Sequence, residues 1–342
     1  MKRVALLGGS FDPIHNGHMQ MANTAIELLR VDEVWFIPTF ATPLKERALT
    51  SKEHRKAMIS LAIEGKPKFR LEPIEIERAE KSYTIDTLKE LKHRYPDHEF
   101  VYLIGSDQVE QFDQWKDHDA LLKLAEFVGI ERDHTFGSNP CDLPCIHMKD
   151  VPVSSSLVRN GMRLDYVDAK VLQYIYTNRL YIKDFIKCRV HEHRYLHSCS
   201  VADLCEAFAV CNGYDGNKAY LIGLFHDVCK ELDHKQMRAW IKKIAPQYLD
   251  AHPAIWHGFV GGQVVKSVFR MKDWQIGNAI HWHVLGQSKD PYAMIVYCAD
   301  KLDPLRGYDS YELIEQCKKD IYKGFVAVKD QNDKYLKEKE KK

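Results

Sequence analysis

The stretch VALLGGSFDPIHNGH, residues 4–18, decides the fold of the first half of the chain. Residues 4–7 form an uninterrupted apolar run, which is typical of a β-strand buried on both faces. Two glycines follow, and a helical pattern starts at Gly17. A strand that turns through glycines into a helix is the first unit of an α/β fold. Its backbone N–H groups and helix dipole suit the binding of a phosphate.

The same pattern repeats along the first half. Strand-like apolar runs are expected at residues 34–37, 69–76, 100–104 and 127–130, and helical patterns at 17–29, 52–63 and 85–94. Strands that alternate with helices pair in parallel, because each helix carries the chain back across a face of the sheet. We therefore expect an α/β doubly wound parallel sheet with a ligand site at the carboxyl ends of its strands.

The composition is that of a globular protein with two domains. The chain has 342 residues, 45% hydrophobic and 28% charged, and is too long for one core at roughly 100–200 residues per domain. Its 49 basic and 48 acidic side chains nearly cancel, which argues against nucleic acid or an anionic membrane as a partner. No apolar run approaches the roughly 20 residues of a transmembrane helix, and the start lacks a signal-peptide pattern. Nine cysteines without a Cys-x-x-Cys pair favour reduced thiols and a cytoplasmic location.

After residue 181 the strand signals fade and helical periodicity dominates. Helices are expected at residues 197–210, 218–228, 235–244, 257–269, 274–283, 292–302 and 310–326. This half is therefore expected to be an all-α domain, joined to the first by a short junction near residues 183–187. The predicted domains are residues 1–185 and 188–330. The Lys- and Glu-rich tail at 331–342 is expected to be a solvated, fraying helix end.

The histidines of the opening stretch indicate its chemistry. His15 and His18 stand in the order His-x-Gly-His where the strand turns into the helix. This pattern resembles the signature of a nucleotidyltransferase family with a Rossmann-like fold. In that family an acceptor oxygen attacks the α-phosphate of ATP, which is accompanied by Mg²⁺, and pyrophosphate leaves. The resemblance implies that both histidines are catalytic and stabilise charge on the α-phosphate.

A later segment, VSSSLVR at residues 153–159, is similar to a second motif of that family. There, serine hydroxyls and an arginine at a helix start hold the β- and γ-phosphates. Together the two motifs imply the following ATP-binding residues: Gly8, Gly9, Ser10, Phe11, His15, His18, Asp107, Ser155, Ser156 and Arg159.

The interior motifs resemble those of nicotinate mononucleotide adenylyltransferases. The chain carries SYTIDTL at residues 82–88, and GSD at 105–107 followed by WK at 115–116. By this resemblance Trp115 stacks on the pyridine ring, and groups around Tyr83 and Thr84 recognise the nicotinate carboxylate. Asp107 would face the ribose of ATP. Lys45 is expected to meet the phosphate of the mononucleotide, although its segment TPLK departs from the family's Pro-Pro-His-Lys.

A second constellation lies beyond residue 190, where His, His-Asp, His, His and Asp recur on successive expected helices. Neutral imidazole and carboxylate are suitable ligands for iron, manganese, zinc or cobalt. This order resembles the HD superfamily of metal-dependent phosphohydrolases. The local sequences RYLHS, LFHDVCK, HGFVG and ADKLDP are similar to a bacterial HD family that cleaves diadenosine tetraphosphate into two ADP at a two-iron site. The implied metal ligands are His197, His226, Asp227, His257, His283 and Asp300.

The resemblance divides these ligands between two ions, which are iron or alternatively Mn²⁺ or Co²⁺. One ion would be held by His197, His226, Asp227 and Asp300, and the other by His257 and His283 with Asp227 bridging. Lys230, as a catalytic group, and Arg306 are expected to grip phosphate oxygens. His281 and His283 lie two positions apart, so on a helix they point about 200° away from each other. Only one of them should therefore face the metals, and the resemblance implies that it is His283.

Two interpretations of different classes remain open. The first is a bifunctional enzyme with the substrates ATP, nicotinate mononucleotide and diadenosine tetraphosphate. The second is an active adenylyltransferase whose helical half acts on another nucleotide or serves as a nucleotide-sensing module. Relatives of the helical half also suggest a homodimer.

Overall fold

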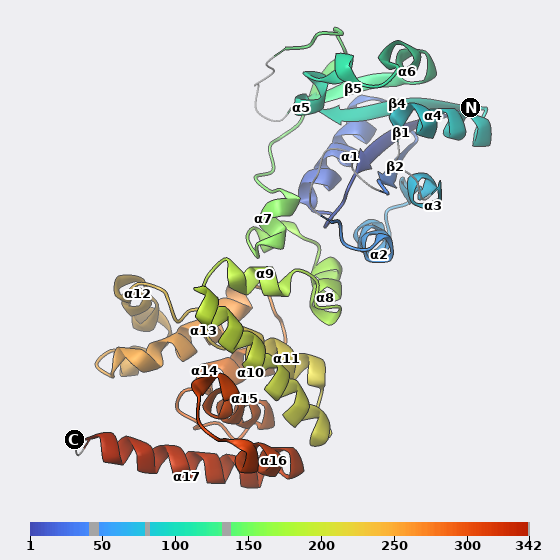
Figure 1. Ribbon diagram of the computed structural model, residues 1–342. Coiled ribbons are helices and arrows are strands. Elements are labelled where there is room, and N and C mark those ends of the chain that lie inside the picture. Colours follow the sequence, from blue (N-terminus) through green and yellow to red (C-terminus); the bar gives the residue numbers. More distant parts are fainter. Residues whose placement is uncertain (41–47, 79–82, 132–137, 341–342) are drawn as a thin grey trace. The chain divides into compact units, whose positions relative to one another are not determined.

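The computed structural model describes residues 1–40, 48–78, 83–131 and 138–340. The chain forms two compact units (Figure 1), here called the α/β unit and the helical unit. The α/β unit comprises Met1–Arg159 and Tyr166–Tyr174, and the helical unit comprises Asn160–Asp165 and the chain from Ile175 onward. Residues 175–185, which the sequence assigns to the first domain, thus pack within the helical unit. The domain limits 1–185 and 188–330 stay a prediction.

The α/β unit is built on a six-stranded parallel sheet with the order β3-β2-β1-β4-β5-β6, which confirms the expected doubly wound fold. The strands are β1 (Lys2–Gly9), β2 (Glu33–Pro38), β3 (Phe69–Leu71), β4 (His98–Gly105), β5 (Glu126–Glu131) and β6 (Cys145–His147). From β1 the chain adds β2 and β3 on one side of the sheet and then β4, β5 and β6 on the other, so the strand order reverses at β1. Doubly wound sheets bind their ligands beside such a reversal, at the carboxyl ends of the strands.

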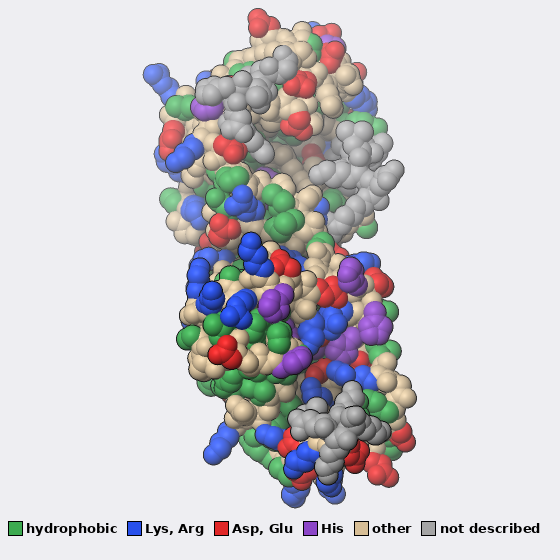
Figure 2. Space-filling view, turned by 90° about the vertical axis from the view of Figure 1, so that its left-hand side faces the viewer, with side chains coloured by type: hydrophobic (Ala, Val, Ile, Leu, Met, Phe, Trp, Pro, Cys, Tyr) green, Lys and Arg blue, Asp and Glu red, His purple; other side chains and the backbone are tan. Residues whose placement is uncertain are grey.

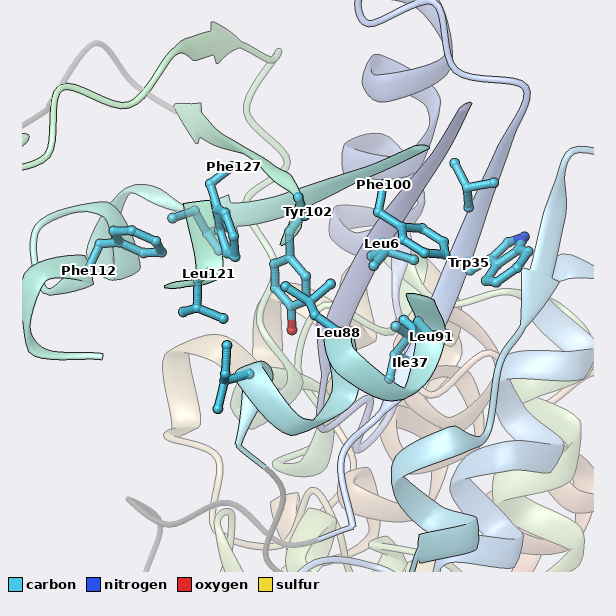
Figure 3. Packing of buried hydrophobic residues seen from close by; sticks show 14 of the residues in the cluster. Leu6, Trp35, Ile37, Leu88, Leu91, Phe100, Tyr102, Phe112, Leu121 and Phe127 are labelled. Atoms are coloured by element: carbon cyan, nitrogen blue, oxygen red, sulfur yellow. The ribbon is translucent and has the colours of Figure 1, made fainter. Parts of the chain in front are cut away.

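Helices cover the sheet, and both faces of its central strands are buried. The helices are α1 (Asn16–Leu28), α2 (Lys52–Ile63), α3 (Ile74–Arg78), α4 (Thr84–Arg94), α5 (Ser106–Val109), α6 (His118–Leu124), α7 (Ser155–Arg159) and α8 (Ala169–Thr177), the last of which ends in the helical unit. Successive residues of a strand point to opposite faces. Leu6 therefore packs in one core cluster with Leu88 and Leu91 of α4 (Figure 3), while its buried neighbours Ala5 and Leu7 face the other layer.

Two details of this unit differ from the expectation. The strand expected at residues 69–76 ends at Leu71, and Ile74–Arg78 is a short helix in which the N–H of Glu77 donates to the carbonyl of Pro73 at 2.9 Å. The alternation Ile-Glu-Ile imitates a strand, but Glu75 is buried together with its neighbours because its carboxylate accepts the hydroxyl of Thr87 at 2.8 Å. The three-residue strand β6 has no counterpart among the expected strands.

The second unit is helical throughout its described residues, as expected. Its helices are α9 (Ile182–Lys187), α10 (Glu192–Cys211), α11 (Gly216–Phe225), α12 (His234–Ile244), α13 (Trp256–Ser267), α14 (Trp274–Trp282), α15 (Pro291–Leu302), α16 (Tyr311–Lys319) and α17 (Ile321–Glu340). Helix α10 packs against α11 and α15, and α13 packs against α14. None of the described helices is both long and apolar enough to cross a bilayer.

Two helix boundaries in this unit differ from the expectation. The helix expected at residues 218–228 ends at Phe225, because the N–H of Val228 turns back to the carbonyl of Phe225 at 3.1 Å. The single helix expected at 310–326 is two helices separated at Asp320. The Asp320 carboxylate accepts the N–H of Tyr322 at 3.0 Å and so starts a new helix. Helix α17 continues through the described part of the charged tail, to Glu340.

Candidate active sites

The first site lies at the carboxyl end of β1, where the chain turns into α1. At Gly8 a side chain has no room, because a Cβ would lie 2.5 Å from the hydroxyl oxygen of Tyr102 on the adjacent strand β4. Phe11 has a left-handed φ of 46° and is fully buried. Its ring lies edge-on to that of His18, with 4.9 Å between the ring centroids. The turn is therefore packed tightly from Gly8 to the first residues of the helix.

His15 and His18 form a reciprocal cap at the start of α1. Nδ1 of His15 accepts the N–H of Gly17 at 3.2 Å, and Nδ1 of His18 accepts the N–H of His15 at 3.2 Å. The two imidazoles thus satisfy N–H groups that a helix start leaves unpaired. Because both Nδ1 atoms accept, the hydrogen of each neutral ring is on Nε2. The ring centroids are 3.9 Å apart, so two N–H donors of the same kind lie next to each other.

The later serine-rich motif contacts this turn directly. The hydroxyl of Ser155 donates to the carbonyl of Pro13 at 2.9 Å, and the guanidinium of Arg159 donates to the carbonyl of Asp12 at 2.6 Å. Arg159 also donates to the hydroxyl of Ser156 at 3.0 Å. The structure therefore brings the two expected ATP-binding motifs together.

A third group of predicted site residues gathers around Tyr102 on β4. Thr84, the first residue of α4, shares a side-chain hydrogen bond with the Tyr102 hydroxyl, and burial raises the pKa of that hydroxyl. The ring of Trp115 lies edge-on to Tyr102, with centroids 6.4 Å apart. Nζ of Lys116 lies 4.5 Å from the ring centroid of Tyr83. Trp115 and Tyr83 are half-buried against the apolar core, so each has an apolar side and an accessible side.

Asp107 and Lys45 complete the predicted residues of the first unit. Asp107 follows β4 in the short helix α5, and its carboxylate accepts a hydrogen bond from the side-chain amide of Gln108 at 3.2 Å. Its Oδ1 lies 2.8 Å from the position that a Cβ of Gly105 would occupy, so the glycine lets this carboxylate approach the end of β4. Lys45 lies outside the described residues.

The second site is a cluster of buried imidazoles and carboxylates inside the helical unit. The six predicted ligands are His197 on α10, His226 and Asp227 just after α11, His257 on α13, His283 just after α14, and Asp300 on α15. All of them are at most 8% exposed. The ligand atoms of five of them form two overlapping groups within 4.8 Å, one of His197, His226 and Asp300 and one of His226, Asp227 and His283. The sixth, His257, contacts Asp227 at 3.0 Å. Five helices thus bring together residues spread over a hundred positions of sequence.

The carboxylate of Asp227 lies between three imidazoles. Its Oδ1 is 3.0 Å from Nε2 of His257 and 3.7 Å from Nε2 of His283, and its Oδ2 is 3.7 Å from Nε2 of His226. A carboxylate whose two oxygens face different imidazoles can be shared by two ions. The ring of His281, in contrast, packs edge-on to Phe259 at 4.7 Å, so His283 enters the cluster and His281 does not.

Burial and charge give four members of this cluster, His226, His257, His283 and Asp227, the protonation states of metal ligands. Burial lowers the pKa of His226 to about 4 and also lowers those of His257 and His283. Burial alone would raise the pKa of Asp227, but the neighbouring imidazoles hold it well below its usual range. Neutral imidazoles beside ionised carboxylates are the forms that bind metal ions.

His226 shows that the residues fit a metal. Its Nδ1 donates to the carbonyl of Gly223 at 2.7 Å, which leaves a lone pair on Nε2. That Nε2 is buried without a hydrogen-bond partner among the described residues. A buried polar atom left in this way costs about 1–3 kcal/mol, and a metal ion would satisfy it. The nitrogen and oxygen donors suit a transition metal such as iron, manganese, cobalt or zinc.

Basic side chains surround the two carboxylates. Figure 2 shows lysine, arginine and histidine side chains gathered on the visible face of the helical unit. The closest contacts are Arg194 to Asp227 at 2.7 Å, Arg306 to Asp300 at 2.6 Å, Lys301 to Asp300 at 2.6 Å, and Lys230 to Nε2 of His257 at 3.1 Å. Burial lowers the pKa of Lys230. Such a ring of cations suits a substrate with several phosphates.

Comparison with known proteins finds a match for each of the two units. Residues 6–161 match a family model described as cytidylyltransferase-like, and residues 194–305 match an HD domain. A Mycoplasma genitalium protein named probable nicotinate-nucleotide adenylyltransferase/Ap4A hydrolase is 30% identical over 343 residues, which covers 96% of this chain and 97% of that protein. The chain belongs to this two-domain family. The Mycoplasma pneumoniae member with the same name is 29% identical over 334 residues, covering 92% of this chain and 95% of its own. A Bacillus licheniformis protein named probable nicotinate-nucleotide adenylyltransferase is 42% identical over 187 residues, which is 53% of this chain and 99% of that protein.

The motifs of the sequence contain the candidate side chains of both sites, but two buried residues that position them were not among the predicted site residues. Arg55 is 1% exposed and donates to the carbonyl of Ser10 at 2.9 Å, which fixes the turn after β1. Asp303 is fully buried, and its carboxylate contacts Nδ1 of His197 at 2.5 Å. The sequence does carry a signal for Asp303, because it lies in the ADKLDP motif three residues after the predicted ligand Asp300. Nothing in the sequence pattern singles out Arg55.

Proposed function

We propose that this chain is a bifunctional enzyme with one activity in each unit. The α/β unit transfers AMP from ATP to nicotinate mononucleotide, which yields nicotinate adenine dinucleotide and pyrophosphate. The helical unit hydrolyses diadenosine tetraphosphate symmetrically to two ADP. The observation that carries the proposal is the match of 96% of the chain to a relative named for both activities. Two separate histidine sites, one capping a helix and one buried among carboxylates, support it.

In the α/β unit, catalysis is positioning and charge stabilisation. An anionic phosphate oxygen of nicotinate mononucleotide attacks the α-phosphorus of ATP, a new P–O bond forms, and the bond to pyrophosphate breaks. This step needs no protein nucleophile. His15 and His18 donate from Nε2 to the α-phosphate oxygens as negative charge grows there, because backbone N–H groups occupy both Nδ1 atoms.

Other groups of the α/β unit bind the two substrates. Ser155, Ser156 and Arg159 hold the β- and γ-phosphates of ATP, whose Mg²⁺ enters with the nucleotide. The turn formed by Gly8, Gly9, Ser10 and Phe11 gives the α-phosphate access to the backbone, and Asp107 binds the ribose. Trp115 stacks on the pyridine ring, the groups around Tyr83 and Thr84 bind the nicotinate carboxylate, and Lys45 binds the mononucleotide phosphate.

In the helical unit, the six buried His and Asp side chains hold two metal ions. We assign iron, with Mn²⁺ or Co²⁺ as alternatives that the same donors accept. When bound, such ions neutralise phosphate oxygens and lower the pKa of water. Lys230 and Arg306 grip the oxygens of the tetraphosphate. Until substrate enters, Arg306 pairs with Asp300, and the ammonium group of Lys230 lies beside the ring of His257.

The test measures both reactions with the full-length protein, kept anaerobic and supplied with Mg²⁺ and Fe²⁺. We expect pyrophosphate from ATP plus nicotinate mononucleotide and, independently, ADP from diadenosine tetraphosphate. His226→Ala should stop ADP release, reduce the bound metal, and leave adenylyl transfer unchanged. The matched control is His191→Ala, because the His191 side chain is 93% exposed and lies outside the cluster. It should change neither reaction.

Failure of both reactions would overturn the proposal. If adenylyl transfer occurs but ADP release is absent and the anaerobic protein holds little transition metal, the helical unit is a sensing module. ADP release that survives His226→Ala would mean that another site carries it. The expected homodimer and cytoplasmic location stay predictions, and ultracentrifugation would test the dimer.

A further inference from the structure

The buried imidazoles of the helical unit differ in what holds their second nitrogen. Nδ1 of His226 donates to the carbonyl of Gly223 at 2.7 Å, and Nδ1 of His283 donates to the carbonyl of Ile280 at 2.6 Å. Both acceptors are neutral. At His197 the acceptor is instead the carboxylate of Asp303, at 2.5 Å from Nδ1. A carboxylate acceptor makes the opposite nitrogen of the ring a stronger donor to a metal than a carbonyl does.

Asp303 is itself held rigidly. It is fully buried, and its Oδ1 accepts the hydroxyl of Ser200 at 2.6 Å and the N–H of Leu305 at 3.2 Å. Ser200 lies one turn after His197 on the same helix, α10. Both oxygens of the carboxylate are therefore used, and the ring of His197 is fixed with its Nε2 3.2 Å from Oδ1 of Asp300.

His257, at the other end of the cluster, has a cation beside its ring in addition to the carboxylate of Asp227, whose Oδ1 lies 3.0 Å from its Nε2. The ammonium group of Lys230 lies 3.2 Å from its Nδ1 and 3.1 Å from its Nε2. A cation beside the ring competes with a metal for the same lone pair. The carboxylates do not produce this difference, because Asp227 and Asp300 each have basic partners, Arg194 for the first and Arg306 for the second. The two ends of the cluster thus differ in their imidazoles.

We propose that Asp303, anchored by Ser200, is the positioning residue for His197, and that the two metal positions are unequal because of it. The position that includes His197, His226 and Asp300 binds metal more tightly and fills first. The position that includes His257 and His283 fills second. This inference rests on the proposed metal-dependent function of the helical unit and adds an order of filling to it.

The experiment is an anaerobic titration of the metal-free full-length protein with Co²⁺, followed by visible absorption, without substrate. The wild-type protein should show two phases. Asp303→Asn, which removes the charge but keeps the shape, should weaken the tighter phase about 10–100-fold and leave the weaker phase unchanged. Ser200→Ala should weaken the same phase less, because the N–H of Leu305 still anchors Asp303. His257→Ala should remove the weaker phase.

Asp309→Asn is the matched control, because the exposed Asp309 also accepts a local backbone N–H, that of Tyr311 at 3.0 Å, but lies outside the cluster. It should leave both phases unchanged. A wild-type titration in one phase of two equal sites would overturn the inference, as would equal weakening of both phases by Asp303→Asn. If Asp303→Asn does not fold, Ser200→Ala decides, and an unchanged tighter phase would overturn the inference. The titration contains no substrate, so it tests metal binding separately from hydrolysis. Two normal phases in a protein that releases no ADP in the separate assay would refute the hydrolase assignment and not this inference.

Discussion

The histidines of the first site and two of the four in the second site lie at opposite ends of helices, and this sets what each of these imidazoles can do. His15 caps the N-terminus of α1, where free N–H groups make its Nδ1 an acceptor and leave the hydrogen on Nε2. His226 and His283 follow the C-termini of α11 and α14, where free carbonyls make Nδ1 a donor and leave a lone pair on Nε2. A helix start thus prepares an imidazole to donate to phosphate, and a helix end prepares it to bind a metal.

The largest effect should come from separating the capping and donating roles of His15. His15→Asn keeps a side-chain acceptor for the N–H of Gly17, because Asn is itself a good N-cap, but it removes the Nε2–H. We expect adenylyl transfer to fall about 10²–10³-fold, the usual cost of losing one donor to developing charge. The thermal unfolding midpoint and ADP release should stay at wild-type values. Full transfer activity in His15→Asn would mean that His15 is a cap and nothing more.

The neutral, buried state of the imidazoles in the second site can be tested by the pH dependence of the free energy of unfolding. The pKa of His226 is about 4 in the folded protein and about 6.5 in an unfolded chain. Between these values the unfolded chain binds more protons, so the free energy of unfolding falls as the pH falls through this window. The slope for His226 alone is up to about 1.4 kcal/mol per pH unit. The lowered pKa values of His257 and His283 act in the same direction.

The pKa of His197 is raised, because its hydrogen bonds to Asp300 and Asp303 outweigh burial. His197 therefore adds to the free energy of unfolding below pH about 6.5, and this addition is lost as the pH rises through its pKa in the folded protein. That pH range lies above the range in which His226 acts. Calorimetry of the metal-free protein between pH 7 and pH 4 would measure the slope. His226→Gln, which cannot titrate, should have a flatter profile than the wild type. Identical slopes for the two proteins would show that His226 is not buried as a neutral ring.

The fold was largely predictable because apolar periodicity is a local signal. The strand–turn–helix of residues 4–18 and the helix at 52–63 follow directly from it. The errors occur where tertiary contacts decide. Ile74–Arg78 imitates a strand, and its burial depends on a distant hydroxyl, that of Thr87. Asp320 is a residue type that often caps a helix, but the apolar pattern continues on both sides of it and predicts one helix.

The candidate ligands were predictable from residue type and order. Of the two buried residues that support the sites, Asp303 lies in a quoted motif that does not reveal its role, and no motif includes Arg55. His226 does not lie on a helix as expected, yet its place at the end of α11 is what gives Nδ1 a carbonyl to donate to. Asp303 contacts His197, which lies 106 positions away in the sequence, and Arg55 contacts Ser10, which lies 45 positions away. Such contacts depend on how helices pack, and periodicity carries no information about that.

The smallest effect should come from His281, which lies two residues from a predicted ligand. Its ring packs on Phe259 at 4.7 Å and takes no part in the cluster. His281→Ala should lower the free energy of unfolding by about 0.5–1.5 kcal/mol, the value of one aromatic pair, and keep the full complement of metal. His283→Ala should instead lose one metal ion, because Nε2 of His283 lies 3.7 Å from the shared carboxylate of Asp227. Metal analysis of both variants checks this, and a metal deficit in His281→Ala would show that helix position does not choose between the two histidines.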